Sequence, residues 1–199
     1  AKSYYENPQS ILEALSLLMR TDYPALSTTP DYEIKNVSDS LATSSSPAFY
    51  MIPPIDNTRG ETIYINPLFT NNENGNLFTT LAHEGFPGHL YQTVYFGRQK
   101  PSHIRYLIDC SGYVEGWATY AESLAYQYAA KYLSGRTAGN SAAPLSAEEA
   151  AAYTRLSWLN RSVNLCIYSL LDVGIHYHSW TPAQAARFLK LFGIRDAAV

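Results

Sequence analysis

The stretch His83-Glu84-Gly85-Phe86-Pro87-Gly88-His89 decides more about the fold and chemistry of this chain than any other. It holds two of the five histidines, and a glutamate directly follows the first. Imidazole nitrogens suit zinc, and a carboxylate beside a bound metal can act as a general base. The best-known arrangement of this kind is H-E-x-x-H on one helix, which puts both imidazoles on one face. The stretch therefore suggests a metal site on a helix, with two more residues between the histidines than that arrangement has.

The spacing of the two histidines requires a break in the helix. Residues six apart in a regular α-helix point about 120° away from each other, so His83 and His89 could not share a metal from an undistorted helix. Pro87 removes a backbone hydrogen bond and clashes with the carbonyl of His83, and Gly88 tolerates unusual dihedral angles. We therefore predict a distortion across residues 85–88 that returns His89 to the side of His83. The alternative is that both histidines are ordinary core or surface residues beside a kinked helix.

A second segment, residues 112–122, supplies two carboxylates to a predicted helix. Glu115 and Glu122 share one face of that helix because they are seven residues apart. Most other positions are apolar or aromatic, which predicts a largely buried helix. Its glutamates then need partners, because burying an unpaired charge is costly. A metal is one such partner, and arginines such as Arg155 or Arg161 are the alternative.

The two segments together match a known kind of ligand set. Two histidines and one downstream glutamate hold catalytic zinc ions that keep an open position for water. In this interpretation Glu84 is the base that activates the water. Glu122 is then an acceptor for the second nitrogen of a ligand imidazole.

A third segment, residues 160–181, offers candidates on the substrate side. Asp172 and His176 are four residues apart, which allows a carboxylate–imidazole contact if the helix continues. His176 is our candidate for donating a hydrogen bond to a developing oxyanion. Arg161 could bind a substrate carboxylate with both guanidinium nitrogens, and Tyr120 is a further candidate for contact with substrate. Purely structural roles are the alternative for each of these residues.

Composition narrows the class of protein. The chain has 199 residues, a net charge of −3 and 16% charged residues, without a basic stripe, so we expect no nucleic-acid partner. No apolar run approaches the roughly 18 residues that would span a bilayer, so we expect no transmembrane segment. The chain begins Ala1-Lys2-Ser3, without Met or a signal-peptide pattern, which we interpret as a start inside a longer protein. Cys110 and Cys166 do not make a disulfide framework, and we expect buried free thiols.

Hydrophobic periodicity and capping signals predict a mainly α, α+β fold. Two short strands are expected at residues 48–52 and 62–66, as a hairpin or as neighbouring edge strands. Residues 21–48 are expected to be loop with at most a few short elements. Helices are expected at 8–20, from 77 through the His-Glu pair and onward to about 97, 110–133, 146–171 (opened by a capping box) and 181–193 (opened by a second capping box).

Three motifs in this order resemble one family. H-E-x-x-P-G-H-x-x-Q is matched from His83 to Gln92, and G-x-x-E-G-W-A-x-Y-A-E from Gly112 to Glu122. D-x-G-I-H-x-x-x-W-[ST] is matched from Asp172 to Thr181. With these motifs, which cover about residues 60–185, the chain resembles the bacterial domain of unknown function 885 family. That family is similar to zincin-type metallopeptidases with a glutamate as third zinc ligand, the gluzincin type.

The resemblance implies a site and a domain organisation. It implies a Zn²⁺ cofactor held by His83, His89 and Glu115, with Glu84 as base. It also implies a helical catalytic domain of zincin-like type, with a small hairpin or sheet before the His-Glu helix. Residues 1–199 would form a single catalytic-domain fragment, in which 1–47 are a helix and irregular lead-in and 48–199 are the metallopeptidase core. Family members are longer, so the remainder of the full-length protein is expected to complete the cleft.

The function expected from these features is zinc-dependent hydrolysis of a peptide or oligopeptide substrate. Water activated by Glu84 would attack the peptide carbonyl. The alternative is a non-catalytic peptide-binding or ligand-binding module, or a structural fragment, that keeps the fold without turnover. The sequence leaves localisation open, with a composition that leans slightly toward a secreted or cell-surface bacterial protein.

Overall fold

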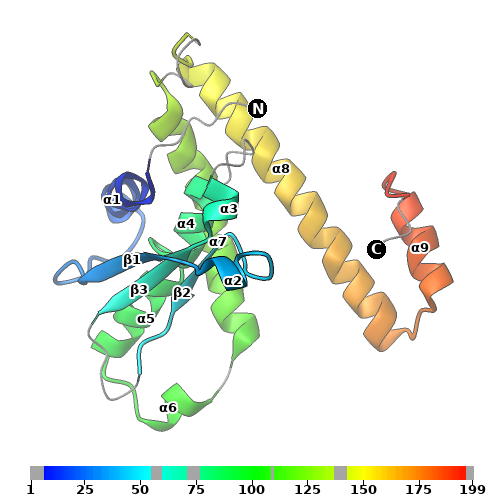
Figure 1. Cartoon of the computed structure of the whole chain (residues 1–199), viewed down its shortest axis with the longest axis horizontal. Coiled ribbons are helices and arrows are strands. Elements are labelled where there is room, and N and C mark those ends of the chain that lie inside the picture. The colour runs from blue at the N-terminus through cyan, green and yellow to red at the C-terminus, as the bar shows by residue number, and fades with distance from the viewer. Residues whose placement is uncertain (1–6, 55–59, 71–76, 109, 137–142, 196–199) are drawn as a thin grey trace. The chain divides into compact units, whose positions relative to one another are not determined.

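The computed structural model describes residues 7–54, 60–70, 77–108, 110–136 and 143–195. Contacts divide the chain into two compact units, residues 1–154 and 155–199, and each is described by itself. Most described residues are helical, and three strands form one small sheet, so the predicted α+β class is confirmed (Figure 1). That the chain is a single catalytic-domain fragment stays a prediction.

The sheet has the strand order β1-β3-β2. β2 (Ala48–Met51) pairs antiparallel with β3 (Glu61–Ile65), which confirms the two predicted neighbouring strands. β1 (Tyr32–Asn36) pairs parallel with the other side of β3 and was not predicted as a strand. Its register is set by a partner about 30 residues further along, which local periodicity in residues 32–36 cannot reveal. The consequence for the site is that β2 is an edge strand.

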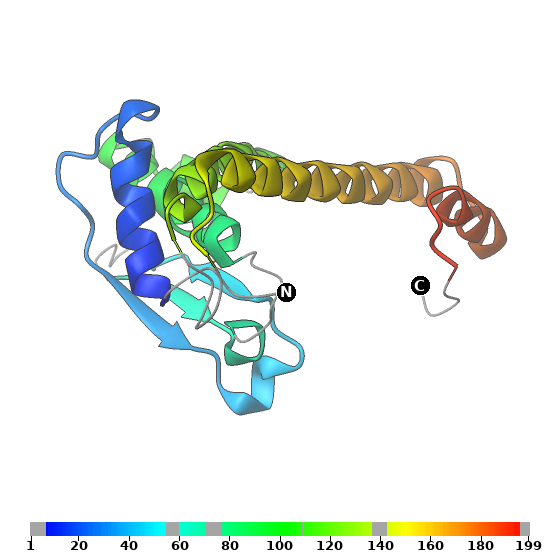
Figure 2. The same ribbon diagram turned by 90° about the horizontal axis from the view of Figure 1, so that it is seen from above.

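One face of the sheet is covered by helices of the first unit. In β3 the side chains of Glu61, Ile63 and Ile65 are buried, which is the alternation of a strand with one covered face. α1 (Pro8–Leu18), α4 (Leu77–Glu84) and α7 (Ser111–Leu133) lie on that side (Figure 2). α4 contacts α1, α5, α7 and β2, so it is the central helix of the core.

The predicted helices of the first unit are present. α1 is capped by the Asn7 side chain and continues as a 3-10 turn over Met19–Thr21, as expected for residues 8–20. α5 (His89–Arg98) is the predicted continuation beyond the His-Glu pair. Asn76 directly precedes α4 and is a plausible N-cap by sequence, but it lies outside the described residues. The described residues of this unit also include the one-turn helices α2 (Asp39–Ala42), α3 (Pro67–Thr70) and α6 (Ile104–Leu107).

Two burial predictions were wrong. The second half of α7 is buried, but Tyr113, Glu115 and Tyr120 in its first half are exposed, so the helix is not largely buried throughout. Cys110 and Cys166 are exposed free thiols and not core residues. Both errors have one cause: an apolar neighbourhood in the sequence does not say whether another element covers that side of a helix.

α8 (Ala147–Asp172) and α9 (Pro182–Lys190) both begin with the predicted capping boxes. Ser146 N–H donates to Glu149 Oε2 over 2.9 Å, and Thr181 exchanges the same pair of bonds with Gln184. Between the helices, residues Val173–Tyr177 form a π-helical turn, and the Trp180 amide donates to the Gly174 carbonyl. Within the part of the chain that the structure describes, no helix is both long and apolar enough to cross a membrane.

Candidate metal centre

The predicted break between the histidines is present. α4 ends at Glu84 and α5 begins at His89, with residues 85–88 as a tight loop that contains a cis peptide before Pro87. The amide of Gly88 donates to the carbonyl of Ala82 over 2.9 Å, so the loop folds back on the last turn of α4. The Trp117 indole N–H donates to the carbonyl of Pro87 over 2.9 Å, which ties the loop to α7.

Gly88 is the residue that makes the return of the chain possible. A Cβ at this position would lie 1.7 Å from the carbonyl oxygen of His83 and 2.4 Å from that of Ala82. Both neighbours are backbone atoms, so a side chain cannot be accommodated by a rotamer change. The sequence uses glycine here because two backbone segments pass one another at this point.

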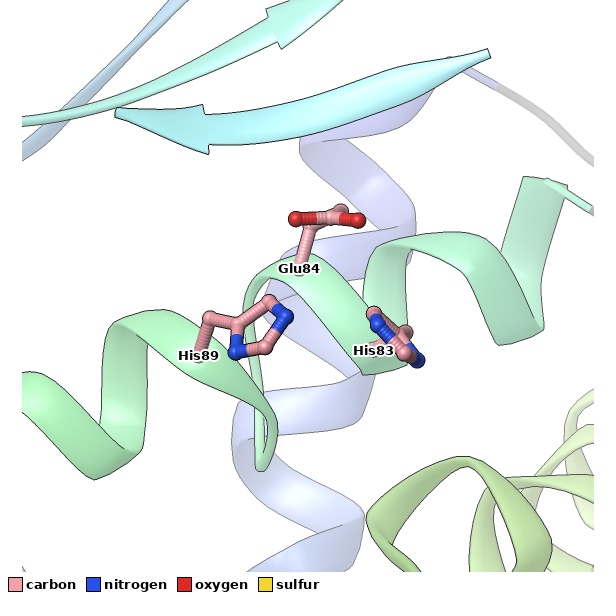
Figure 3. A group of neighbouring side chains, drawn as sticks. All are labelled: His83, Glu84 and His89. Carbon is pink, nitrogen blue, oxygen red and sulfur yellow. The ribbon is translucent and has the colours of Figure 1, made fainter. Parts of the chain in front are cut away.

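The loop brings the two imidazoles together. Their ring centroids are 4.8 Å apart and the rings are nearly perpendicular. One ligand-type atom each from His83, Glu84 and His89 lies within 4.8 Å of the other two (Figure 3). The predicted return of His89 to the side of His83 is therefore confirmed as geometry.

Glu115 reaches the same place from α7. Its Oε2 lies 3.4 Å from Nε2 of His83, and its Oε1 lies 3.6 Å from Nε2 of His89. Two atoms that each lie about 2 Å from a tetrahedral zinc ion are roughly 3.3 Å apart. The separations in this structure are close to that value. The two Nε2 atoms and the Glu115 carboxylate thus fit a three-ligand zinc site, and the 63% exposure of the Glu115 side chain leaves one side of the site open.

Glu84 and Glu115 compete for the place of third ligand. Glu84 is within reach of both imidazoles, but its Oε2 already accepts a hydrogen bond from the amide of Tyr50 over 2.9 Å. Figure 3 shows its carboxylate lying between the turn and the neighbouring strand. Glu115 is close to both Nε2 atoms through two different oxygens. Glu115 could therefore complete a ligand set with the two histidines, whereas one oxygen of Glu84 is already held by the Tyr50 amide.

Glu122 orients His83 from the opposite side of the ring. Its Oε2 lies 3.3 Å from Nδ1 of His83, and the Glu122 side chain is buried. Burial alone would lower the pKa of His83. The hydrogen bond to Glu122 and the charges of Glu84, Glu122 and Glu115 outweigh burial and raise that pKa above its ordinary value. With Nδ1 facing Glu122, the ring presents Nε2 to Glu115. An Nδ1–H directed at Glu122 is the tautomer that a metal ligand at Nε2 would need.

His89 and Glu84 are shifted in directions that favour their neutral forms. Burial, and then the charge of His83, lower the pKa of His89. Burial raises the pKa of Glu84, although the Tyr50 amide acts against that shift. Nδ1 of His89 is buried and has no hydrogen-bond partner among the described residues. Of the two imidazoles, His89 thus favours the neutral form that a metal ligand needs, whereas the carboxylates around His83 favour its charged form.

The remaining predicted residues are not all part of this cluster. Tyr120 lies on α7, 56% exposed, with its ring 6.3 Å from that of Trp117. Asp172 and His176 meet in the second unit, where His176 Nε2 lies 3.7 Å from Asp172 Oδ1. Arg161 lies on α8 in the same unit. Roles for these four residues toward the cluster stay predictions.

Sequence reasoning missed Tyr50, whose amide contacts Glu84, and Glu61, which the side chain of Tyr50 contacts. The hydroxyl of Tyr50 donates a short hydrogen bond to Oε2 of Glu61, and both residues are buried. The signal for Glu61 was present: it shares the period-two face of Ile63 and Ile65, which places a carboxylate on the buried face of a strand. The contact between the Tyr50 amide and Glu84 had no such signal, because every residue except proline has a backbone N–H and the sequence does not show which one meets Glu84.

Comparison with known proteins places the chain in a family. The family model described as "Bacterial protein of unknown function (DUF885)" matches residues 2–198. The chain belongs to this family. The resemblance carried by the three motifs is thereby confirmed at the level of the family, whose description assigns no activity. No curated protein matches the sequence.

A solved structure shares the fold. It is described as "the putative lipoprotein from Colwellia psychrerythraea", is 22% identical, and superposes with a TM-score of 0.66. The match covers 92% of this chain but 28% of that protein. The chain thus spans less than a third of the length of this neighbour, and the likeness concerns the fold alone.

Proposed function

We propose that this DUF885 chain carries the catalytic centre of a zinc-dependent peptidase of gluzincin-like type. The observation that carries the proposal is the convergence of three groups from three helices. The carboxylate of Glu115 faces both imidazoles. It lies 3.4 Å from Nε2 of His83 and 3.6 Å from Nε2 of His89. Structural histidines beside a kinked helix would not need a shared carboxylate and a buried acceptor behind one ring.

The residues of the site have distinct tasks in this proposal. A bound zinc ion would supply a Lewis acid and lower the pKa of water. Glu84 accepts the proton of the attacking water through the oxygen that the Tyr50 amide does not hold. Glu122 fixes the ring of His83 so that Nε2 faces the site. His176 is the proposed donor to the oxyanion that forms when water adds to the peptide carbonyl.

The substrate in this proposal is an extended peptide. β2 is an edge strand beside Glu84, and its outward-facing main-chain groups other than the Tyr50 amide, which Glu84 holds, can pair with a further strand. This places a peptide group next to the cluster, with the side chains of the peptide alternating between the sheet and the open side at Glu115. The remainder of a longer protein would complete the cleft, which agrees with the 28% coverage of the solved neighbour.

We also propose a location at the bacterial cell surface. The structural neighbour is described as a "putative lipoprotein", and this is the observation behind the proposal. Fractionation of cells that express the full-length protein tests it, and recovery in the soluble cytoplasmic fraction alone would contradict it.

The test of the function separates metal binding from turnover. Elemental analysis of freshly purified full-length protein should find about one zinc per chain, and the Glu84→Gln variant should keep it. A mixed peptide library should be hydrolysed by the wild type, and hydrolysis should be abolished in the variant. Undiminished turnover by Glu84→Gln would contradict the mechanism, and the absence of any divalent ion together with no thermal shift on adding zinc would contradict the site.

A further inference from the structure

We infer that Tyr50, through its buried hydrogen bond to Glu61, is a positioning residue that keeps Glu84 available as the base. The inference rests on the proposed function of the site but names residues that lie outside the three sequence motifs. It concerns Tyr50 in β2, whose backbone N–H contacts Glu84 and whose side chain contacts Glu61.

The first step is the place of Glu84. It is the last residue of α4, directly before the loop 85–88, and its carboxylate lies within reach of both imidazoles. A carboxylate free to turn there would become a further metal ligand, because a hard anion beside a bound cation is drawn to it. Its Oε2 is held instead by the amide of Tyr50 over 2.9 Å. This bond keeps one oxygen of Glu84 directed at the strand.

The second step is the strand that offers the amide. β2 has only four residues, and the sheet supports it on one side only, through β3. Tyr50 lies opposite Ile63 in that ladder, and its own N–H points away from β3, toward Glu84. A short edge strand with one neighbour is easily displaced unless its side chains are anchored.

The third step is the anchor. The Tyr50 side chain is 8% exposed, and its hydroxyl donates to Oε2 of Glu61, which is 4% exposed and begins β3. The same hydroxyl is in hydrogen-bond contact with Thr93, one turn beyond His89 on α5. Tyr50 thus connects the strand, the helix that carries His89 and the carboxylate of Glu84.

The pKa shifts of Tyr50 and Glu61 agree with a hydrogen bond that holds the two side chains together. Burial raises the pKa of the Glu61 carboxyl, and burial with the hydrogen bond to Glu61 raises the pKa of Tyr50. The raised pKa favours the protonated hydroxyl, which is the form that donates to Glu61. A buried carboxylate without this donor would be costly, so the pair is strongly held in place.

The experiment uses the full-length protein and two pairs of variants. Tyr50→Phe removes the hydroxyl but keeps the ring and the amide, and Glu61→Leu removes the acceptor. Glu61→Gln keeps an acceptor oxygen and is the conservative rescue. Tyr64→Phe is the matched control, because Tyr64 lies on the opposite face of the sheet, where its ring stacks on Phe49.

The first readout needs no activity. Hydrogen exchange, followed by mass spectrometry in the shortest peptides that contain residue 50, should be about tenfold faster at that amide in Tyr50→Phe and Glu61→Leu. Glu61→Gln and Tyr64→Phe should match the wild type. Unchanged exchange in both disruptive variants would overturn the inference. So would acceleration spread evenly over the whole chain, since that would show loss of global stability and no local anchor.

The second readout uses turnover and zinc affinity. Tyr50→Phe should lower kcat by about tenfold with KM within about twofold of the wild type, the effect expected from losing one orienting hydrogen bond. Its zinc affinity should be unchanged, because His83, His89 and Glu115 are untouched. Equal kcat in wild type and variant would overturn the inference. A wild type that neither binds zinc nor hydrolyses peptides would contradict the proposed function, while the exchange readout would still decide the role of Tyr50.

Discussion

Oε2 of Glu122 lies 3.3 Å from Nδ1 of His83, on the side of the ring away from Glu115. The contact joins the buried part of α7 to the last turn of α4 and fixes the orientation of the ring. The two carboxylates of α7 thus act on one imidazole from opposite sides. Glu122 is covered by the core, whereas Glu115 remains open to solvent.

Changing Glu122 should weaken zinc binding without removing a ligand. Glu122→Gln keeps the shape of the side chain and an acceptor oxygen but removes the charge, so we expect about a tenfold loss of zinc affinity. Glu122→Ala should lose up to about a hundredfold, the range found when an outer hydrogen-bond partner of a ligand is removed. Competition with a chromophoric chelator measures both values. Affinity equal to wild type in Glu122→Ala would show that His83 is oriented by other contacts.

Glu115 should behave as a ligand and not as a structural residue. Its side chain is 63% exposed, so Glu115→Ala should change the free energy of unfolding of the metal-free protein by no more than about 0.5 kcal/mol. The same variant should lose its zinc on dialysis against a weak chelator under conditions where the wild type keeps it. Glu148→Ala, at an exposed glutamate in the first turn of α8, is the control. Retained zinc in Glu115→Ala would transfer the ligand role to Glu84.

The close approach at Gly88 should make any side chain there destabilising. In Gly88→Ala the new Cβ would overlap the carbonyl oxygen of His83, and we expect a loss of about 3 kcal/mol or more in the free energy of unfolding. Gly116→Ala is a matched control on α7, because a Cβ there meets nothing within 4 Å. It should stabilise the helix by up to about 1 kcal/mol. Urea denaturation gives both values, and equal effects would contradict the packing described for the loop.

Protonation of His83 should limit zinc binding at low pH. In the metal-free protein Glu122 and the neighbouring carboxylates favour the imidazolium, so the pKa of His83 is raised and zinc affinity should fall as the pH drops through that value. Glu122→Gln removes charge that favours the imidazolium, so the pKa of His83 should move down. An NMR titration of the His83 ring protons checks the sign. A rise of the pKa in the variant would contradict the assigned contact.

Much of the fold followed from local signals. Capping boxes at Ser146 and Thr181 marked the starts of α8 and α9, and Pro87-Gly88 marked the break between α4 and α5. β1 was missed because its partner, β3, is distant in the sequence and the pairing is parallel. Local periodicity predicts elements well where their own residues decide the conformation, and poorly where a remote strand does.

In the site, too, features set by local sequence could be predicted, and features set by contacts between distant segments could not. His83, His89 and the glutamates of α7 could be predicted to converge, because helix geometry relates residues on one face and a proline and a glycine mark the break. The hold of the Tyr50 amide on Glu84 could not, because it depends on which strand lies at the sheet edge. The exposure of Glu115 also lay beyond the sequence, since it depends on what covers the first half of α7.

His176 provides the sharpest test of the proposed chemistry away from the ligands. It is exposed in the second unit, beside Asp172, and His176→Ala should leave both the free energy of unfolding and the zinc affinity near their wild-type values. If its imidazole donates to the oxyanion, kcat should fall by about a hundredfold or more. In Asp172→Asn kcat should fall less, because this substitution disturbs only the orientation and charge of the His176 imidazole. His178→Ala, at a neighbouring exposed histidine, is the matched control and should keep full activity. Equal peptide hydrolysis by His176→Ala and His178→Ala would remove His176 from the mechanism and leave the zinc centre without a donor from this unit.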